Sequence, residues 1–317
     1  LHHCLSGICR NEVDLTCLLP GLPALAHPII INAITGGADA VAKINESLAI
    51  VARETGSAMA VGSQFGTVRT GLHRDSYTIV RKCNPKGLIF ANLSAFASVE
   101  QAKAAIDMIS ADALQIHLNP AQELAMEEGD RDFSNCLSHI EAMVQGVGVP
   151  VIVKETGCGM AKKEAQDLLD VGVTLLDIGG AGGTNFPAIE HQRYPEGNEE
   201  LSEWGIPTVL SLLSVVQTVG WGNGVIASGG IRSALDVVKA QVLGASAVAM
   251  AGNLLQKIQQ EGTEETIHFL QRLLNKVLDF YTLLGCRTFR DLHEARYYLT
   301  GETAQAVSWL RKYDQND

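Results

Sequence analysis

The chain has 317 residues with 24 basic and 35 acidic side chains, which gives a formal charge of −11. This length fits one parallel α/β barrel of about 250 residues with additions, whose core needs no disulfide or structural metal. The acidic balance argues against a nucleic-acid partner, which selects a basic surface, but local groups can still attract a small anionic ligand. No apolar run reaches the roughly 18 residues of a membrane span, so we expect no membrane partner.

Cysteine usage indicates a reducing compartment. The seven cysteines are odd in number and include no Cys-x-x-Cys pair, a pattern typical of free thiols in a cytoplasmic protein. Cys4 and Cys9 could ligate a metal with a nearby His, although isolated thiols are the preferred interpretation. The chain opens on Leu1 without the pattern of a signal peptide, and we expect its N-terminal segment to be incomplete.

Eight short apolar runs dominate the organisation of the chain. They are Pro28–Gly37, Ser57–Ser63, Gly87–Leu93, Ala113–Asn119, Val149–Glu155, Leu175–Gly180, Val225–Gly230 and Ala247–Gly252. Nearly continuous apolar runs are typical of parallel strands covered on both faces.

Stretches with helical periodicity separate these runs. They are Ala40–Thr55, Val99–Ser110, Lys162–Val171 and Ala234–Leu243. Ser98 is the expected N-cap of the second helix, and Gly56, Gly172 and Gly244 lie where they could cap C-termini. The alternation predicts an α/β fold, a (β/α)8 TIM barrel over residues 1–317 as a single domain. A doubly wound open sheet is the rival, but it usually has fewer strands.

Two segments fall outside the repeat. Thr184–Thr208 is rich in acidic residues and widens the gap between the sixth and seventh strands. We interpret this inserted loop as a lid or oligomer contact, or alternatively as a solvated decoration. After Gly252 a helical stretch continues to Leu284, and we expect this C-terminal extension to complete the outer ring of helices.

The active site of such a barrel lies at the carboxyl ends of its strands. Two glycine-rich loops follow neighbouring strands there, Gly179–Thr184 and Ser228–Arg232. Glycines let backbone N–H groups approach an anion, so these loops favour a phosphate-bearing cofactor, whereas tight chain reversal is the simpler alternative.

A second constellation follows the fourth strand. Alternation places His117 and Asn119 on one face, and the next turn brings Gln122 and Glu123 to the mouth of the barrel. Glu123 suits Mg²⁺, with Glu128 and Asp130 as lesser candidates, but an acid that faces the dipole at a helix start is the preferred interpretation from spacing alone. His117 could equally be an interior histidine satisfied by hydrogen bonds.

Lys154 and Cys158 stand at the end of the fifth strand. A lysine that lines a barrel must be paired or hold an anionic ligand, which favours a cofactor role for Lys154. Contact with Glu155 is not expected, because adjacent strand residues face opposite ways. Nothing marks a base for Cys158, so we interpret it as a spectator thiol.

Together the strings at the strand ends carry a family resemblance. They include Ile31–Gly37, Ala60–Gln64, Ala113–Asn119, Glu128–Phe133, Val151–Glu155, Gly182–Phe186 and Ser228–Arg232. They resemble the type 2, FMN-dependent isopentenyl-diphosphate delta-isomerases over essentially the whole chain. The family's Arg-Lys-x-x-His segment is absent, and Phe65 stands where many members have Arg, with Arg69 as a possible replacement.

The resemblance implies roles for matching positions. Gln122 would be catalytic and contact the substrate, His117 and Asn119 would contact the diphosphate, and Glu123 would bind Mg²⁺. The residues implied to bind FMN are Ala33, Ile34, Thr35, Ser63, Asn92, Lys154, Thr184, Gly230, Ile231, Arg232, Ala251 and Gly252.

The resemblance also implies an activity, the reversible isomerisation of isopentenyl diphosphate to dimethylallyl diphosphate in isoprenoid biosynthesis. Reduced FMN would act as an acid–base cofactor, NADPH would serve only to reduce the flavin, and the protein would form a tetramer or octamer. The enzyme alternative is an FMN-dependent oxidoreductase of the hydroxy-acid oxidase or IMP dehydrogenase kind. The first would need a His beside Arg232, and the second a Cys after the glycine turn. A catalytically silent barrel that binds a phosphate ligand is a further alternative.

Overall fold

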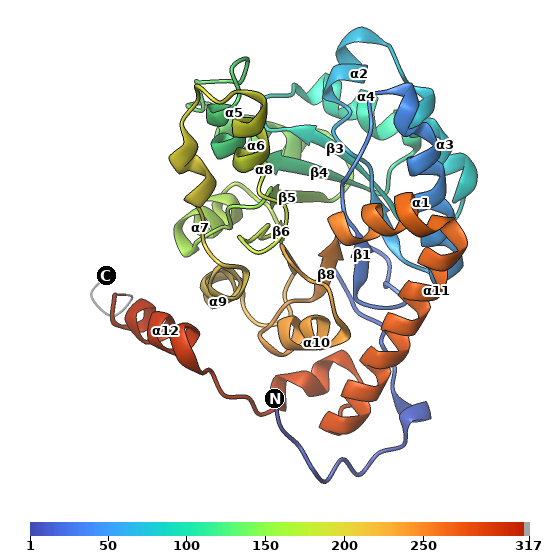
Figure 1. The fold of residues 1–317 in the computed structure, drawn as a ribbon, viewed down its shortest axis with the longest axis vertical. Coiled ribbons are helices and arrows are strands. Elements are labelled where there is room, and N and C mark those ends of the chain that lie inside the picture. The colour runs from blue at the N-terminus through green and yellow to red at the C-terminus, as the bar shows by residue number, and fades with distance from the viewer. Residues whose placement is uncertain (314–317) are drawn as a thin grey trace.

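The eight apolar runs form eight parallel strands that close into a barrel (Figure 1), which excludes the open sheet. This computed structural model describes residues 1–313. Each strand pairs with the next, and β8 pairs with β1. The strands are β1 (Ile29–Ile31), β2 (Ala58–Ala60), β3 (Ile89–Ser94), β4 (Ala113–Leu118), β5 (Val151–Glu155), β6 (Leu175–Asp177), β7 (Val225–Ser228) and β8 (Ala247–Met250).

Helices surround the barrel. They are α1 (Ala42–Thr55), α2 (Phe65–Thr70), α3 (Asp75–Cys83), α4 (Val99–Ile109), α5 (Pro120–Ala125), α6 (Cys136–Gly146), α7 (Lys162–Asp170), α8 (Phe186–Arg193), α9 (Thr208–Val219), α10 (Ala234–Val242), α11 (Gly252–Leu284) and α12 (Gly301–Tyr313). Short 3₁₀ turns occupy Arg10–Glu12, Asp39–Val41, Glu199–Glu203 and Phe289–Glu294. Within residues 1–313, no helix is both long enough and apolar enough to cross a membrane.

The four predicted helices are confirmed, together with their caps. Ser98 caps α4, since its hydroxyl accepts the Gln101 N–H while the Gln101 side chain accepts the Ser98 N–H. Gly56, Gly172 and Gly244 all adopt positive φ after a helix, the conformation for which glycine is favoured.

Two expectations need correction. The segment Thr184–Thr208 is not a loop throughout, because Asn185 caps α8 through the Ala188 N–H and a 3₁₀ turn follows. The helix α11 packs against α1 and α10 as expected, but it breaks at Gly262, where φ is 84°. It therefore reaches its length as two helical pieces joined at a glycine.

Strand alternation divides the core into two clusters. Outward residues such as Ile29 and Ile31 pack under the helices, whereas inward residues such as Ile30 and Phe90 fill the lumen. Cys17, Leu19 and Leu25 from the N-terminal segment join the inner cluster, and Cys17 pairs with Leu25 in an antiparallel bridge. A methyl group added at Gly21 would lie 3.0 Å from Pro150, which directly precedes β5. This segment therefore plugs the amino-terminal end of the barrel, a feature that the sequence did not predict.

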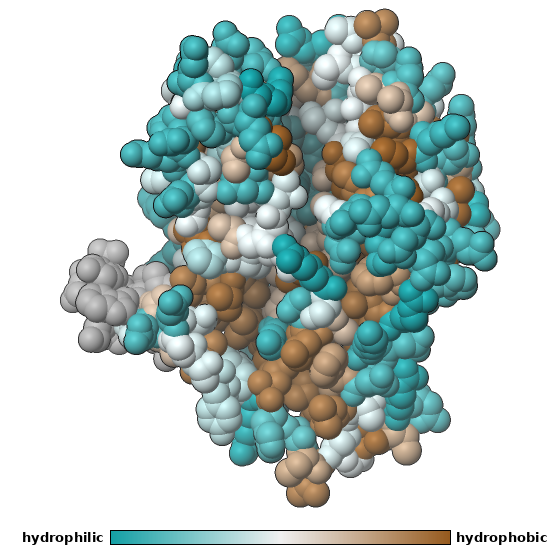
Figure 2. All heavy atoms as spheres, in the orientation of Figure 1, coloured by the Kyte–Doolittle hydropathy of each residue, from teal (hydrophilic) through white to brown (hydrophobic). Residues whose placement is uncertain are grey.

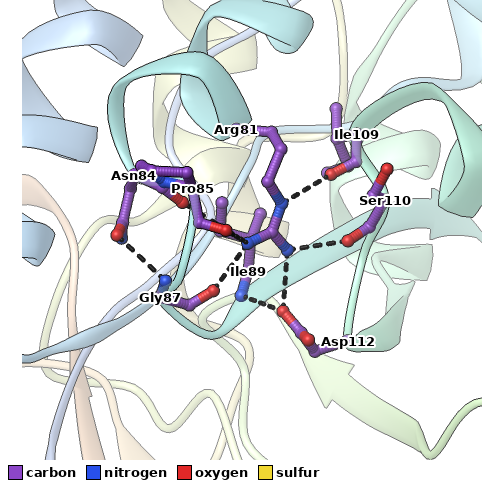
Figure 3. A network of polar contacts seen from close by, with 8 residues as sticks. All are labelled: Arg81, Asn84, Pro85, Gly87, Ile89, Ile109, Ser110 and Asp112. Atoms are coloured by element: carbon purple, nitrogen blue, oxygen red, sulfur yellow. Dashed lines mark hydrogen bonds and ion pairs between the residues drawn. The ribbon is translucent and has the colours of Figure 1, made fainter.

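Arg81 of α3 ties several elements together at that same end (Figure 3). Its guanidinium donates to the backbone oxygens of Gly87 (2.8 Å), Ile109 (3.1 Å) and Ser110 (2.7 Å) and to the Asp112 carboxylate (2.8 Å). The same carboxylate oxygen accepts the Ile89 N–H at 2.9 Å. One side chain thus satisfies the end of α4 and the starts of β3 and β4.

We expect Arg81→Met to lower the free energy of unfolding by about 2–4 kcal/mol, because several partly buried carbonyls and Asp112 lose a charged donor together. Urea denaturation measures the change. Arg53→Met is the matched control, since its half-exposed side chain makes one ion pair with Glu54 and one exposed hydrogen bond to the Cys83 backbone oxygen, which should together contribute about 1 kcal/mol or less. Equal losses in the two variants would contradict a special role for Arg81.

Candidate active site

A cavity of about 570 Å³ lies at the carboxyl ends of β5 to β8, within the range typical of cofactor pockets. Its ionisable lining residues are Lys154, Glu155 and Arg232, and among residues 1–313 its lining includes no histidine. Figure 2 shows the surface hollowed between the side that carries α5 and α8 and the side that carries α1 and the start of α11. Two basic groups at the cavity give it an anion-binding character despite the net charge of −11.

The two glycine-rich loops pack directly against each other at this cavity. A Cβ atom at Gly229 would lie 2.0 Å from the Gly180 oxygen, and one at Gly230 would lie 2.3 Å from the Gly182 oxygen. Both residues also adopt positive φ, 100° and 82°. Close loop packing therefore requires these glycines, and the Gly230 and Ile231 N–H groups donate no hydrogen bond within residues 1–313.

Most of the residues expected to bind a cofactor line this cavity. They are Ala33, Lys154, Thr184, Gly230, Ile231, Arg232, Ala251 and Gly252. Ile34, Thr35, Ser63 and Asn92 do not line it. Thr35 donates its hydroxyl to Asn45, Ser63 is exposed, and Ile34 packs against the outer core.

Lys154 is buried and does contact Glu155, but through the backbone oxygen and not through the carboxylate, which strand alternation turns away as expected. Its Nζ donates to the backbone oxygen of Glu155 at 2.8 Å, a contact that alternation of side chains does not prevent. The Glu155 carboxylate faces the other way and accepts the N–H groups of Gly157, Cys158 and Gly159. Glu155 thus fixes both the lysine and the following loop.

Burial shifts the pKa values of two groups in this loop, the Glu155 carboxyl and the Cys158 thiol. Burial raises the pKa of the Glu155 carboxyl, while its three backbone donors act in the opposite direction. Burial, together with the nearby Glu155 charge, raises the pKa of the Cys158 thiol to about 11. The thiol stays protonated at neutral pH, which agrees with a spectator role.

The residues expected to bind substrate cluster separately, at the end of β4 and on α5. Asn119 donates to Glu123 at 2.8 Å and to Gln122 at 3.3 Å, and the second Glu123 oxygen accepts the Asp130 N–H. None of these residues lines the cavity of β5 to β8. The two sets meet where β4 pairs with β5, since His117 and Lys154 are register partners.

Glu190 is a site residue that sequence reasoning missed. It is buried on α8, and its two oxygens accept Gln122 Nε2 at 2.9 Å and Arg193 Nη1 at 2.5 Å. Asn185 followed by Pro187 indicates the start of a helix, so the sequence signals α8 but not the inward direction of Glu190. The Glu190 carboxylate, on the helix that follows β6, therefore orients the Gln122 amide.

Glu123 is an isolated carboxylate with respect to metal binding. Within residues 1–313, no group of three or more His, Cys, Asp or Glu side chains is arranged to hold a metal ion. Glu128 pairs with Arg193, and Asp130 is exposed. Mg²⁺ can bind one or two carboxylates with waters and substrate phosphates, so Glu123 fits a shared site but not a closed protein site.

Polar side chains cross the upper part of the barrel lumen as one hydrogen-bonded layer. Asp177 accepts from the Ser228 hydroxyl and from Asn32 Nδ2 (2.7 Å), and Asn32 Oδ1 accepts from Gln115 Nε2 (3.0 Å). Gln115 Oε1 accepts from Asn92 Nδ2 (3.0 Å), and Asn92 Oδ1 lies 2.9 Å from His117 Nδ1. This layer, called the amide chain below, runs from β7 to β4 beneath the site. Asn92 therefore belongs to the lumen.

His117 stands at one end of this chain. Burial, reinforced by the charge of Lys154, lowers the pKa of its imidazole to about 3. The ring is consequently neutral at physiological pH. The interpretation as an interior histidine satisfied by hydrogen bonds holds for its Nδ1 atom.

Comparison with known proteins decides the family. The model of the FMN-dependent dehydrogenase family matches residues 85–299. The isopentenyl-diphosphate delta-isomerase of Geobacillus sp. (strain WCH70) is 45% identical over 304 residues, which are 96% of this chain and 86% of the relative. The chain belongs to the isopentenyl-diphosphate delta-isomerase family. It is an isomerase of that family, and the isopentenyl-diphosphate delta-isomerase of Staphylococcus haemolyticus is 42% identical over 313 residues, covering 98% of this chain and 88% of the relative.

Two solved oxidase structures have the same fold as this chain but little sequence identity to it. A mandelate oxidase variant superposes with a TM-score of 0.66 at 18% identity, over 92% of this chain and 85% of its own. A lactate oxidase of Pediococcus acidilactici gives 0.68 at 16% identity, over 93% and 81%. The TIM barrel predicted from the sequence is thus confirmed.

Proposed function

We propose that this isomerase interconverts isopentenyl diphosphate and dimethylallyl diphosphate with FMN as its cofactor. The observation that carries the proposal is the 45% identity, over 96% of the chain, to a protein named for that substrate. The reaction moves a double bond by adding a proton at one carbon and removing one from another, with no net oxidation. The site must therefore bind an anion and hold protons in place.

The cavity of β5 to β8 has the properties that an FMN site requires. It offers unpaired N–H groups at Gly230 and Ile231, the Arg232 guanidinium and the start of α11, all of which suit a phosphate. Lys154 would lie beside the flavin ring, and Ala33 would line it. Ile34, Thr35, Ser63 and Asn92 remain predicted neighbours of the ring. When bound in its reduced form, FMN would supply proton-transfer chemistry at this site, with NADPH as the initial reductant.

The segment after β4 would bind the substrate. Asn119 and His117 would contact the diphosphate side, and Glu123 would contribute one carboxylate to a Mg²⁺ ion shared with phosphate oxygens. Gln122 would reach the hydrocarbon end. Since an amide is uncharged at ordinary pH, Gln122 positions or relays a proton, while the buried Glu190 carboxylate orients it.

A flavin oxidoreductase of the hydroxy-acid oxidase kind is the second candidate, because its fold is shared by the mandelate and lactate oxidases. The lining of the cavity argues against it. Arg232 lines the cavity, but within residues 1–313 no histidine accompanies it to take a proton from a hydroxy acid. Cytoplasmic location and a homo-oligomeric state stay predictions of the sequence.

The first measurement is anaerobic conversion of isopentenyl diphosphate with FMN and Mg²⁺, with and without dithionite or NADPH. We expect product only with reductant, and no stoichiometric consumption of NADPH. Product without any reductant would refute the requirement for reduced flavin. Bound FMN without product under either condition would favour the oxidoreductase.

Omitting Mg²⁺ should weaken substrate binding, since Glu123 would no longer share a cation with the diphosphate.

We expect Gln122→Leu to lower kcat by roughly 10²-fold, because the amide held by Asn119 and Glu190 is replaced by an apolar side chain. Flavin content should be unchanged, since Gln122 does not line the cavity. Gln166→Leu, at an exposed position of α7, is the matched control and should retain full activity. Unchanged kcat in Gln122→Leu would remove this residue from the mechanism.

We expect Gly230→Ala to weaken FMN binding at least about tenfold, because its Cβ would lie 2.3 Å from the Gly182 oxygen and force the two loops apart. Quenching of flavin fluorescence on titration measures the affinity. Gly66→Ala is the control, since a Cβ there meets no atom within 4 Å. Equal affinity in both variants would show that the loop pair does not hold the cofactor.

A further inference from the structure

The donor and acceptor directions of the amide chain are fixed at the Asp177 end. The backbone N–H of Ala33 donates to Asn32 Oδ1 at 2.9 Å, and a backbone N–H can only donate. The other end of the Asn32 amide, 2.7 Å from the Asp177 carboxylate oxygen, is therefore its NH₂. A backbone group that cannot reverse its role thus determines how the Asn32 amide lies.

This direction passes from one amide to the next across the lumen. Asn32 Oδ1 must accept from Gln115 Nε2, which leaves Gln115 Oε1 to accept from Asn92 Nδ2. Asn92 then presents its oxygen to His117 Nδ1 at 2.9 Å. An oxygen without a proton can bind that nitrogen only if the nitrogen carries the hydrogen.

We infer that Asp177 and Asn32, acting through Gln115 and Asn92, hold His117 as its neutral Nδ1–H tautomer and leave Nε2 as a hydrogen-bond acceptor. These four are positioning residues, since they act on the site through His117. The free imidazole of histidine prefers the opposite Nε2–H tautomer, and the hydrogen bond at one ring nitrogen sets which nitrogen is protonated, so the amide chain imposes the Nδ1–H form.

The charge next to His117 also favours a neutral imidazole. Lys154 is the register partner of His117, and its ammonium group opposes a second proton on the ring. Ser94, the partner of His117 on β3, is uncharged. Within residues 1–313, the Nε2 atom of His117 has no hydrogen-bond partner. It is also not among the fully buried side-chain atoms that lack a partner, so it remains accessible. It is therefore free to meet a ligand, as an acceptor.

One consequence rests on the proposed function. A fully ionised diphosphate oxygen is itself an acceptor, so Nε2 cannot bind it directly. His117 would instead reach the anion through a donor, either a water molecule or a protonated phosphate oxygen. The contact between His117 and the diphosphate that the sequence predicts would therefore be one in which Nε2 accepts a hydrogen bond.

The test is a ¹H–¹⁵N correlation spectrum of the full-length protein as purified, labelled with ¹⁵N at histidine, near neutral pH and without substrate. A His117→Asn difference spectrum assigns the signal among the nine histidines. We expect one protonated-type resonance at Nδ1 and one unprotonated-type resonance at Nε2. A protonated Nε2 in the wild-type protein would overturn the inference.

A variant then tests the origin of the tautomer. Gln115→Met breaks the chain with a side chain of similar size, after which Asn92 can turn its NH₂ toward the ring, and we expect the Nε2–H form to appear. Gln241→Met is the control, because Gln241 is equally buried but lies on α10 outside the chain. Gln115→Met with the wild-type tautomer would refute the role of the chain.

Two further conditions keep the test decisive. If Gln115→Met does not fold, Asn92→Leu removes the acceptor at the other end and should give the same shift toward Nε2–H. Because the spectra need no substrate and no turnover, the tautomer can be established even if the isomerase assay fails. A negative assay would then overturn only the proposed reaction and the contact to diphosphate.

Discussion

The rest of the structure depends on the constraint that closure places on the barrel lumen. Side chains that point inward from eight strands share one narrow space, where water is scarce and a buried polar group without a partner costs about 1–3 kcal/mol. The lower lumen meets this constraint with apolar residues such as Ile30, Phe90 and Ile152. The upper lumen meets it with the amide chain, in which every amide group finds a partner.

The amide chain also joins the two parts of the site. The cavity of β5 to β8 and the segment that carries Asn119 and Gln122 share no lining residue, yet both stand on this layer. Lys154 lies at the boundary as the register partner of both His117 and Asp177. Burial keeps the His117 imidazole neutral, the Lys154 charge on one side reinforces this, and the same cation adds positive charge to the cavity on its other side.

The opposite end of the barrel serves stability. There the N-terminal segment plugs the lumen and Arg81 gathers the ends of α3 and α4 with the starts of β3 and β4. At the site end, Gly229 and Gly230 allow two loops to approach more closely than any side chain would permit. This division agrees with the general separation of stability and activity between the two faces of such barrels.

The sequence by itself determined the strands, the main helices, their caps and the glycine loops, because periodicity and capping depend on neighbours a few residues away. It also located Lys154 at the end of the fifth strand, and Gln122 and Glu123 in the segment that follows the fourth. Only the tertiary structure paired Gln122 with Glu190, turned Lys154 onto the Glu155 carbonyl and aligned Asp177, Asn32, Gln115 and Asn92. The pairs Asn32–Asp177 and Gln122–Glu190 join residues far apart in the chain, so they exist only once the barrel closes. Which amide donates and which accepts is then decided by the backbone N–H of Ala33 at one end of the chain.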